Sequence, residues 1–314
     1  MKVYHGLEHF KAEKAVVLTI GSFDGVHLGH QEIIARLKAK AAAINGLSAL
    51  MTFTPHPRIA LNKDKEKLRL LTNDAEKEAL LRHFGLDVLI FIPFDQAFSS
   101  QPAAVFLEEI LLTKIGVKHL VIGYDHKFGQ NRSGDIHFLR AQSAESQQFT
   151  VEEISQQTMD ELAVSSTKIR LALEAGDVTL AQKLLDFPYS LSGEVVKGDQ
   201  IGRKLGYPTA NLALNDAYKQ VPGAGVYATQ VEMGGALFNA MTYIGTRPTI
   251  AGSKNNIETN ILDFQGDLYD QRLKISFLQH IRSDVKFESL EELTQQISRD
   301  ERKVRLYFGM PDKA

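Results

Sequence analysis

The sequence predicts an α/β protein in two parts, a helix-covered parallel sheet followed by a small antiparallel β-barrel with a C-terminal helix. From about residue 15 to 185, short apolar runs alternate with helical patterns, whereas from about 190 strand-like runs are separated by Gly, Pro and Asn. Strands that alternate with helices form parallel sheets, and closely spaced strands form barrels or sandwiches. The length of 314 residues fits two domains. We expect the boundary where DFPY interrupts the helical pattern, which gives domains 1–186 and 187–314.

The first part contains buried strands separated by helices. Strands rich in Val, Ile and Leu are expected at 16–20, 48–53, 87–94 and 119–123, and helices at 30–44, 73–84 and 102–115. A parallel sheet of this kind is covered on both faces and binds ligands beyond the carboxyl ends of its strands. Every unusual loop of this part follows a strand, so these loops are the candidate binding site.

The second part consists of strands and one final helix. The strand-like runs are SLSGEVV, GVYATQVEM, ALFNAMTYIG, NIETNILDF and RLKISFLQHI, whose pattern is typical of an antiparallel barrel. The last segment, 289–308, is an amphipathic helix that we expect to open with a reciprocal capping box of Ser289 and Glu292.

Composition excludes several classes of protein. The net charge of −2 and the lack of a dense basic block argue against broad binding to nucleic acid. The chain has no cysteine, which excludes disulfides, thiolate metal sites and cysteine nucleophiles. Its first residues lack the apolar core of a signal peptide, and no apolar run approaches the roughly 20 residues that cross a bilayer. We therefore expect a cytoplasmic protein, monomeric or weakly self-associating, with small-molecule partners and neither nucleic acid nor membrane.

The segment GSFDGVHLGH, residues 21–30, stands where a strand turns into a helix. Backbone N–H groups and the helix dipole favour an anion there, and Gly25 and Gly29 would let the backbone approach it. His27 and His30 project from nearly the same face, an arrangement that suits a phosphate whose charge grows during reaction. A metal pair or simple helix capping are the alternatives, although no third metal ligand is apparent nearby. The segment is neither a Walker loop nor a dinucleotide fingerprint.

These residues resemble the His-x-Gly-His signature of the nucleotidyltransferase superfamily, in the form seen in bacterial FAD synthetases, which implies a Rossmann-like domain. The resemblance predicts a partner motif after the last strand, and SSTKIR, residues 165–170, fits it. Its hydroxyls, free N–H groups and guanidinium make a second phosphate clamp. The resemblance implies catalytic roles for His27, His30 and Arg170. It implies ATP binding by Gly21, Phe23, Asp24, Gly25, Gly29, Asp125, Ser165, Ser166 and Thr167.

Two further loops fit the same family. TPHPR, residues 54–58, resembles its Pro-His-Pro element, and we expect the prolines to fix the loop and exclude a helix. GYDHKFGQNRSG, residues 123–134, resembles its Gly-x-Asp-Phe-x-Phe-Gly loop, with His126 in place of the usual aromatic residue. The resemblance assigns flavin contacts to Pro55, His56, Pro57, Phe128 and Gly129.

A glycine-rich stretch, KGDQIGRKLGYPTANL, covers residues 197–212. A loop of this kind can fold over phosphates. Thr209 and Asn211 alternate in an extended segment and would point the same way. A hydroxyl and an amide oxygen are hard ligands that suit Mg²⁺ together with nucleotide phosphates.

This stretch as a whole resembles the flavokinase signature, and Pro-Thr-Ala-Asn is its specific core. The resemblance implies phosphate binding by Gly198, Gly202, Arg203, Gly206 and Pro208, and Mg²⁺ binding by Thr209 and Asn211. IETNILDF, residues 257–264, matches the flavokinase strand whose glutamate faces the substrate hydroxyl, so Glu258 is the expected base, with Asn260 where many relatives have histidine. Arg282 and Phe287 lie in a segment that resembles the part closing on the flavin.

The resemblance covers about residues 15 to 308, and the chain is identified as a member of the bifunctional flavokinase and FAD synthetase family. It implies phosphorylation of riboflavin by ATP to FMN, then attack of the FMN phosphate on a second ATP to give FAD and pyrophosphate, with Mg²⁺. Two alternatives remain open. Another nucleotidyltransferase would leave Pro-Thr-Ala-Asn and Glu258 unexplained. A flavin-binding regulator with inactive sites is disfavoured by the intact His27, His30, Arg170 and Thr209.

Overall fold

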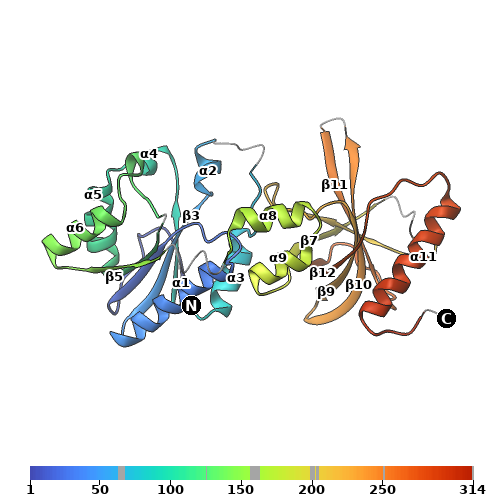
Figure 1. Cartoon of the computed structure of the whole chain (residues 1–314), viewed down its shortest axis with the longest axis horizontal. Helices are drawn as coiled ribbons and strands as arrows, with labels where there is room; N and C mark the ends of the chain where they lie inside the picture. The colour runs from blue at the N-terminus through green and yellow to red at the C-terminus, as the bar shows by residue number, and fades with distance from the viewer. Residues whose placement is uncertain are drawn as a thin grey trace. The chain divides into compact units, whose positions relative to one another are not determined.

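The computed structural model describes residues 1–62, 68–124, 126–155, 163–198, 202, 205–249 and 252–312, apart from the side chains of 246–249 and 252–255. The chain divides into two compact units, Met1–Ser166 and Thr167–Ala314 (Figure 1). The first contains a six-stranded sheet and the second a closed six-stranded barrel. The predicted fold class is confirmed in both parts.

All strand pairs of the first sheet are parallel, and its order is β1-β4-β3-β2-β5-β6. The chain moves outward from β2 through β3 to β4 and then returns to the other side of β2 with β5. Such a reversal opens a crevice at the carboxyl ends of the two central strands. The strands are β1 (Lys2–His5), β2 (Val16–Ile20), β3 (Leu47–Thr54), β4 (Val88–Pro93), β5 (Val117–Gly123) and β6 (Thr150–Ile154).

Helices cover both faces of this sheet (Figure 1). One face packs against α1 and α3 through buried residues such as Leu37 and Leu81, and the other against η1 and α6 through Leu111 and Leu139. The helices are α1 (Leu28–Ala43), α2 (Pro57–Ala60), α3 (Asp74–His83), α4 (Gln96–Ser99), α5 (Ala103–Val105), the π-type η1 (Phe106–Ile115), the 3₁₀ turn η2 (Gln130–Arg132) and α6 (Ile136–Ser146).

The second sheet closes on itself in the order β10-β11-β8-β7-β12-β9, with antiparallel pairing. Residues such as Thr242 and Phe277 are fully buried. Val226 and Met241 form a separate buried cluster with Val304 of the last helix. The strands are β7 (Ser190–Val196), β8 (Ala210–Ala213), β9 (Gly225–Met233), β10 (Ala236–Thr249), β11 (Gly252–Ile261) and β12 (Arg272–Ser283).

The last helix, α11 (Leu290–Tyr307), begins as predicted after Ser289, whose hydroxyl accepts the N–H of Glu292 at 3.1 Å. The second half of the predicted capping box is wrong. The Glu292 carboxylate accepts the N–H of Glu288 at 3.2 Å instead of that of Ser289. The N–H groups of Glu288 and Ser289 both precede the helix and have no partner within it. The long Glu292 side chain can therefore accept a hydrogen bond from either of them.

Two helices precede the barrel within the second unit, α8 (Ser166–Glu174) and α9 (Val178–Leu185). The Leu173 carbonyl accepts the N–H of Gly223 at 2.8 Å, and α9 packs against β12. Asp186 ends α9 in a left-handed conformation, with φ of 67°. The boundary expected after Asp186 thus coincides with the end of α9, and it stays a prediction.

Candidate active sites

The loop that joins β2 to α1 has an unusual backbone. Phe23, Gly25 and Val26 have φ angles of 47°, 87° and 43°. Glycine adopts such angles readily, but a β-branched residue such as valine does so rarely. Conformations of this kind cluster at functional sites, where the surrounding structure holds them in place.

Buried hydrogen bonds hold this loop. The Asp24 carboxylate accepts the N–H groups of Leu71 and Thr72 at 2.8 and 3.1 Å. The Thr72 hydroxyl in turn accepts the N–H of Gly25 at 3.1 Å. The carbonyl of Asp24 accepts the hydroxyl of Ser166 at 2.9 Å, which brings the start of SSTKIR beside GSFDGVHLGH. Asp24 therefore positions the loop, and its predicted contact with ATP stays a prediction.

His27 and His30 lie together at the N-terminus of α1, as predicted. Their rings stack with centroids 3.7 Å apart, and Phe23 stacks on the far side of His30 at 4.5 Å. The Nδ1 atom of His30 is buried and has no hydrogen-bond partner among the described residues. Burial, with help from His27 and Lys77, holds the pKa of His30 well below its ordinary value.

Lys77 is buried near the loop that joins β2 to α1, which the sequence pattern did not reveal. It lies on α3 and is only 5% exposed, although the run DAEKEALL is typical of a solvated helix face. Burial lowers the pKa of Lys77, while Asp74 and Asp24 partly oppose that change. A buried lysine with a lowered pKa is a candidate for a functional role.

A cavity of about 640 Å³ lies in the same unit and has an aromatic wall. Phe106 and Phe128 pack with ring centroids 5.2 Å apart, and Gly129 contributes to the wall with φ of 70°. The lining also includes Phe53, Phe94, Phe98, Pro57 and the cations Arg58, Lys127 and Arg132. Aromatic rings with cations suit a planar fused-ring ligand that carries an anionic group.

The Pro-His-Pro element adopts a conformation that differs from the prediction. A short helix, α2, begins at Pro57, so the expectation that the prolines exclude a helix is wrong. Proline fits the first helical position because its missing N–H would have no helical partner there. His56 caps this helix by accepting the N–H of Arg58 at 3.2 Å, and the Thr54–Pro55 peptide bond is cis. Of the three predicted residues, Pro57 lines the cavity.

The remaining predicted residues of the first site vary in exposure. Ser165 and Thr167 are exposed at the start of α8, and Arg170 is half-buried one turn further along that helix. Asp125 and, in the second site, Arg203 lie outside the described residues.

The second candidate site is built from strand register. The pairing of β8 with β11 sets Asn211 opposite Glu258, and both lie on the strand face expected for Thr209. The Thr209 hydroxyl donates to one carboxylate oxygen of Glu258 at 3.2 Å, and the Asn256 amide donates to the other at 2.5 Å. The structure thus brings Thr209, Asn211 and Glu258 together, with the carboxylate held by two donors.

The glycine-rich loop packs tightly on this group. A Cβ atom at Gly198 would clash with the Asn211 amide, and one at Gly202 would clash with the Tyr207 carbonyl. Glycine is required at Gly202 because the neighbouring atom belongs to the backbone, whereas a side chain at Gly198 would have to displace the Asn211 amide. The Pro208 carbonyl accepts the Asn260 amide at 2.7 Å, which ties the loop to β11.

A pocket of about 270 Å³ opens beside Glu258 and Thr209. Arg282 stacks over Phe287 at 5.7 Å and pairs with the buried Asp300 of α11 at 2.8 Å, so both predicted flavin residues line this pocket. Its other lining residues include Leu205, Tyr207, Val226, Met241, Leu293 and Ile297.

Tyr243 is a pocket residue that sequence reasoning missed. It is the direct cross-strand partner of Glu258, and its hydroxyl donates to Asp284 at 3.1 Å. Burial, with Asp284 and Glu258 nearby, raises the pKa of Tyr243 to about 12. The strand alternation that placed Glu258 could have identified Tyr243 if the register of β10 against β11 had been known.

The described residues contain no group of three or more His, Cys, Asp or Glu side chains arranged to hold a metal ion. Within the same residues, every helix is too short or too polar to cross a membrane.

Comparisons with known proteins agree over the whole chain. The FAD synthetase family matches residues 9–168, and the riboflavin kinase family matches residues 185–308. A relative from Pseudomonas fluorescens is 40% identical over 302 residues, which make up 96% of each chain. A relative from Escherichia coli is 37% identical over 320 residues, with full coverage of both chains. One from Bacillus subtilis is 36% identical over 311 residues, 98% of this chain and 97% of the relative.

A solved structure described as a macrolide-efflux protein from Streptococcus pneumoniae has the same fold. Its TM-score is 0.86 at 30% identity, over 96% of this chain and 98% of that chain. The three relatives above are all named bifunctional riboflavin kinase/FMN adenylyltransferase. With a stacked histidine pair at a helix N-terminus and a Thr–Glu pair in a barrel, the chain belongs to the family of bifunctional riboflavin kinase/FMN adenylyltransferases.

Proposed function

We propose that the two activities of this enzyme are divided between its domains, with adenylyl transfer in residues 1–186 and phosphorylation in residues 187–314. The enzyme phosphorylates riboflavin with ATP to FMN, and then joins FMN to the AMP part of ATP to give FAD and pyrophosphate. The observation that carries the division is the hydrogen bond between Thr209 and Glu258, which lies wholly within the barrel unit.

In the barrel, Glu258 is the base for riboflavin phosphorylation. The terminal ribityl hydroxyl is a neutral nucleophile, and a carboxylate that takes its proton makes attack on the γ-phosphorus easier. Thr209 and Asn256 hold both oxygens of this carboxylate, so its direction is fixed before substrate binds. The flavin ring would occupy the pocket lined by Tyr243, Arg282 and Phe287.

Thr209 and Asn211 fit a Mg²⁺ ion that is shared with the phosphates of ATP. A hydroxyl, an amide and the nearby Glu258 carboxylate form a set of hard oxygen ligands. When bound, Mg²⁺ neutralises phosphate charge. The glycine-rich loop packs against Asn211 and would cover the phosphates, with Gly198, Gly202, Arg203, Gly206 and Pro208 as their proposed contacts.

In the first domain, the nucleophile is the FMN phosphate, which is already an anion. No strong base is required, and the need is to neutralise charge on the reacting phosphates. His27 and His30 at the N-terminus of α1 would donate to the phosphates of ATP, and Ser165, Ser166, Thr167 and Arg170 are the proposed second phosphate clamp. The aromatic cavity beside Phe128 would hold the flavin ring.

The fate of labelled ATP tests this scheme. With riboflavin and γ-labelled ATP, label should appear in FMN and then in FAD, whereas α-labelled ATP should label FAD alone. A protein that binds flavin without either transfer would support the regulator alternative. A product other than FAD from FMN would support another nucleotidyltransferase.

We also propose a cytoplasmic enzyme that is monomeric or weakly self-associating and that has no nucleic-acid or membrane partner. Both reactions consume ATP, and the sequence pattern favours small-molecule partners. Cell fractionation and analytical ultracentrifugation measure the two properties directly.

A further inference from the structure

Lys77 is placed at the edge of the sheet where β3 ends. Its ammonium lies 3.4 Å from the hydroxyl of Thr52, and that hydroxyl lies 3.4 Å from the carbonyl of Ser22. Ser22 belongs to the GSFDGVHLGH segment. The charge of Lys77 also contributes to the lowered pKa of His30. The ammonium is therefore next to the strained loop and the histidine pair.

The contacts of this ammonium are too long to satisfy it. Besides Thr52, the described residue whose polar group comes within 4 Å of this ammonium is Asp74, with a carboxylate oxygen at 3.8 Å. Good N–H···O hydrogen bonds span about 2.7–3.2 Å, and a lysine has three N–H donors. A buried charge is costly unless it is paired. The charges of Asp74 and Asp24 partly offset this buried positive charge, but no carboxylate among the described residues lies within hydrogen-bond distance of the ammonium.

Asp74 is not a sufficient partner. One of its carboxylate oxygens accepts the hydroxyl of Thr54 at 2.7 Å, and its side chain is 47% exposed. A pair three residues apart on a helix, with one exposed member, contributes only about 0.2–0.5 kcal/mol. Helix stability therefore does not account for a buried lysine at this position.

We propose that Lys77 binds the polyphosphate of ATP at the adenylyltransferase site, and that its charge stabilises the departing pyrophosphate. This inference rests on the proposed location of adenylyl transfer. An FMN phosphate oxygen forms a bond to the α-phosphorus, and the bond from that phosphorus to the bridging oxygen breaks. The electron pair of the broken bond stays with pyrophosphate, where negative charge grows. A fixed cation beside that group is worth more in a buried site than in water.

The key variant is Lys77→Met, which keeps most of the side-chain volume and removes the charge. The kcat/KM for ATP in FAD formation from supplied FMN should fall about 10²-fold. The affinity for inorganic pyrophosphate with Mg²⁺, measured by calorimetry, should fall at least about tenfold. The unfolding temperature should be unchanged or higher, because an incompletely compensated buried charge has been removed. Lys77→Arg should recover part of both losses.

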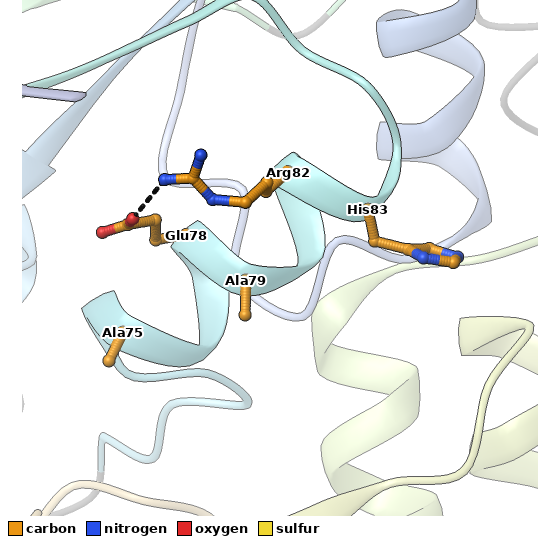
Figure 2. Close-up of a pocket in the computed structure, with 5 residues that line it drawn as sticks. All are labelled: Ala75, Glu78, Ala79, Arg82 and His83. Atoms are coloured by element: carbon orange, nitrogen blue, oxygen red, sulfur yellow. Dashed lines mark hydrogen bonds and ion pairs between the residues drawn. The ribbon is translucent and has the colours of Figure 1, made fainter. Parts of the chain in front are cut away.

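Arg82→Met is the matched control on the same helix. Figure 2 shows Arg82 of α3 paired with Glu78, with Ala75, Ala79 and His83 on the same helix. The Arg82 side chain is exposed, and it lies 2.8 Å from the Glu78 carboxylate. This variant removes an exposed cation and should leave ATP use and pyrophosphate affinity unchanged. Riboflavin phosphorylation should be unaffected in every variant.

Undiminished FAD formation or unchanged pyrophosphate affinity in Lys77→Met would overturn the proposal. A loss of activity with a lower unfolding temperature and weaker FMN binding would also overturn it, since that pattern indicates loop packing. His30→Ala separates the two levels of inference. If His30→Ala also forms FAD normally, the proposed location of adenylyl transfer is wrong. If His30→Ala fails to form FAD while Lys77→Met forms it normally, only the proposed role of Lys77 is wrong.

Discussion

The two candidate sites are both proposed to bind phosphates, yet they are built from different kinds of residue. The barrel site centres on a carboxylate, Glu258, held by regular strands and two hydrogen-bond donors. The sheet site places His27, His30 and Lys77 around a loop with strained backbone angles. The difference follows the nucleophile, because a neutral alcohol benefits from a base whereas an anionic phosphate needs only neutralisation.

The largest test of this contrast is Glu258→Gln. Glutamine keeps the size of the side chain but cannot accept the riboflavin proton at neutral pH. Riboflavin phosphorylation should fall about 10²- to 10⁴-fold, the usual cost of losing a positioned base. Supplied FMN should still be converted to FAD, as measured by chromatography. Lost conversion of FMN in a variant that is folded by circular dichroism would contradict the division of chemistry.

His30→Ala is the reciprocal test. It removes a ring aimed at the reacting phosphates, so FAD formation from FMN should fall roughly 10²- to 10³-fold. FMN should then accumulate from riboflavin, because the barrel site is intact. Slower FMN production, with normal thermal unfolding, would show that the first site takes part in phosphorylation.

Gly198→Ala tests how closely the barrel site is packed. The added methyl group would clash with the Asn211 amide and push the loop away from Thr209. A displacement of about 1 Å can cost up to about 10²-fold, so we expect phosphorylation to fall roughly 10- to 10²-fold, with FAD formation from FMN unchanged. Gly234→Asn is the control, because nothing lies within 4 Å of a Cβ there and asparagine tolerates its φ of 57°. Equal rates for both variants would argue against a close fit at Gly198.

Two fragments test where the kinase domain begins. Residues 187–314 contain every kinase motif and should fold and make FMN. Residues 167–314 also keep α9, with Leu184 and Leu185 buried, so their free energy of unfolding should be higher by about 2 kcal/mol. Denaturant titration of both fragments gives this difference. An inactive shorter fragment beside an active longer one would move the boundary toward Thr167.

The smallest expected effect is the pH dependence of stability that His30 causes in the first unit. Its folded pKa is lowered mainly by burial, so the unfolded chain takes up the proton first as the pH falls below about 6.5. The free energy of unfolding should decline below that pH, and His30 accounts for at most about 1.4 kcal/mol of this decline per pH unit. Above pH 7, His30 should make no contribution to the pH dependence. His30→Gln should have a shallower slope. His119, whose pKa is also lowered by burial, is present in both proteins and cancels in the difference.

The central strands of both sheets were predictable, because long apolar runs and alternation require burial wherever they occur. The edge strands KVYH and TVEEI were missed, since one buried face gives too weak a pattern. The start of α2 at Pro57 was missed because proline disfavours helix interiors and yet fits their first position. Sequence patterns of this kind are least informative at the edges of sheets and at the first residues of helices.

The sequence by itself determined the fold class, the two motifs and the chemistry that they imply, since those depend on residue types at fixed short spacings. Only the tertiary structure decided which partners surround them. Lys77 reads as a surface lysine until α3 packs against the sheet, and Tyr243 acquires its role from the register of β10 against β11. Asp24, whose predicted contact with ATP stays a prediction, supports the loop through Leu71 and Thr72. The physical reason is that burial and cross-strand contact join residues far apart in the chain, and no local pattern records those distances.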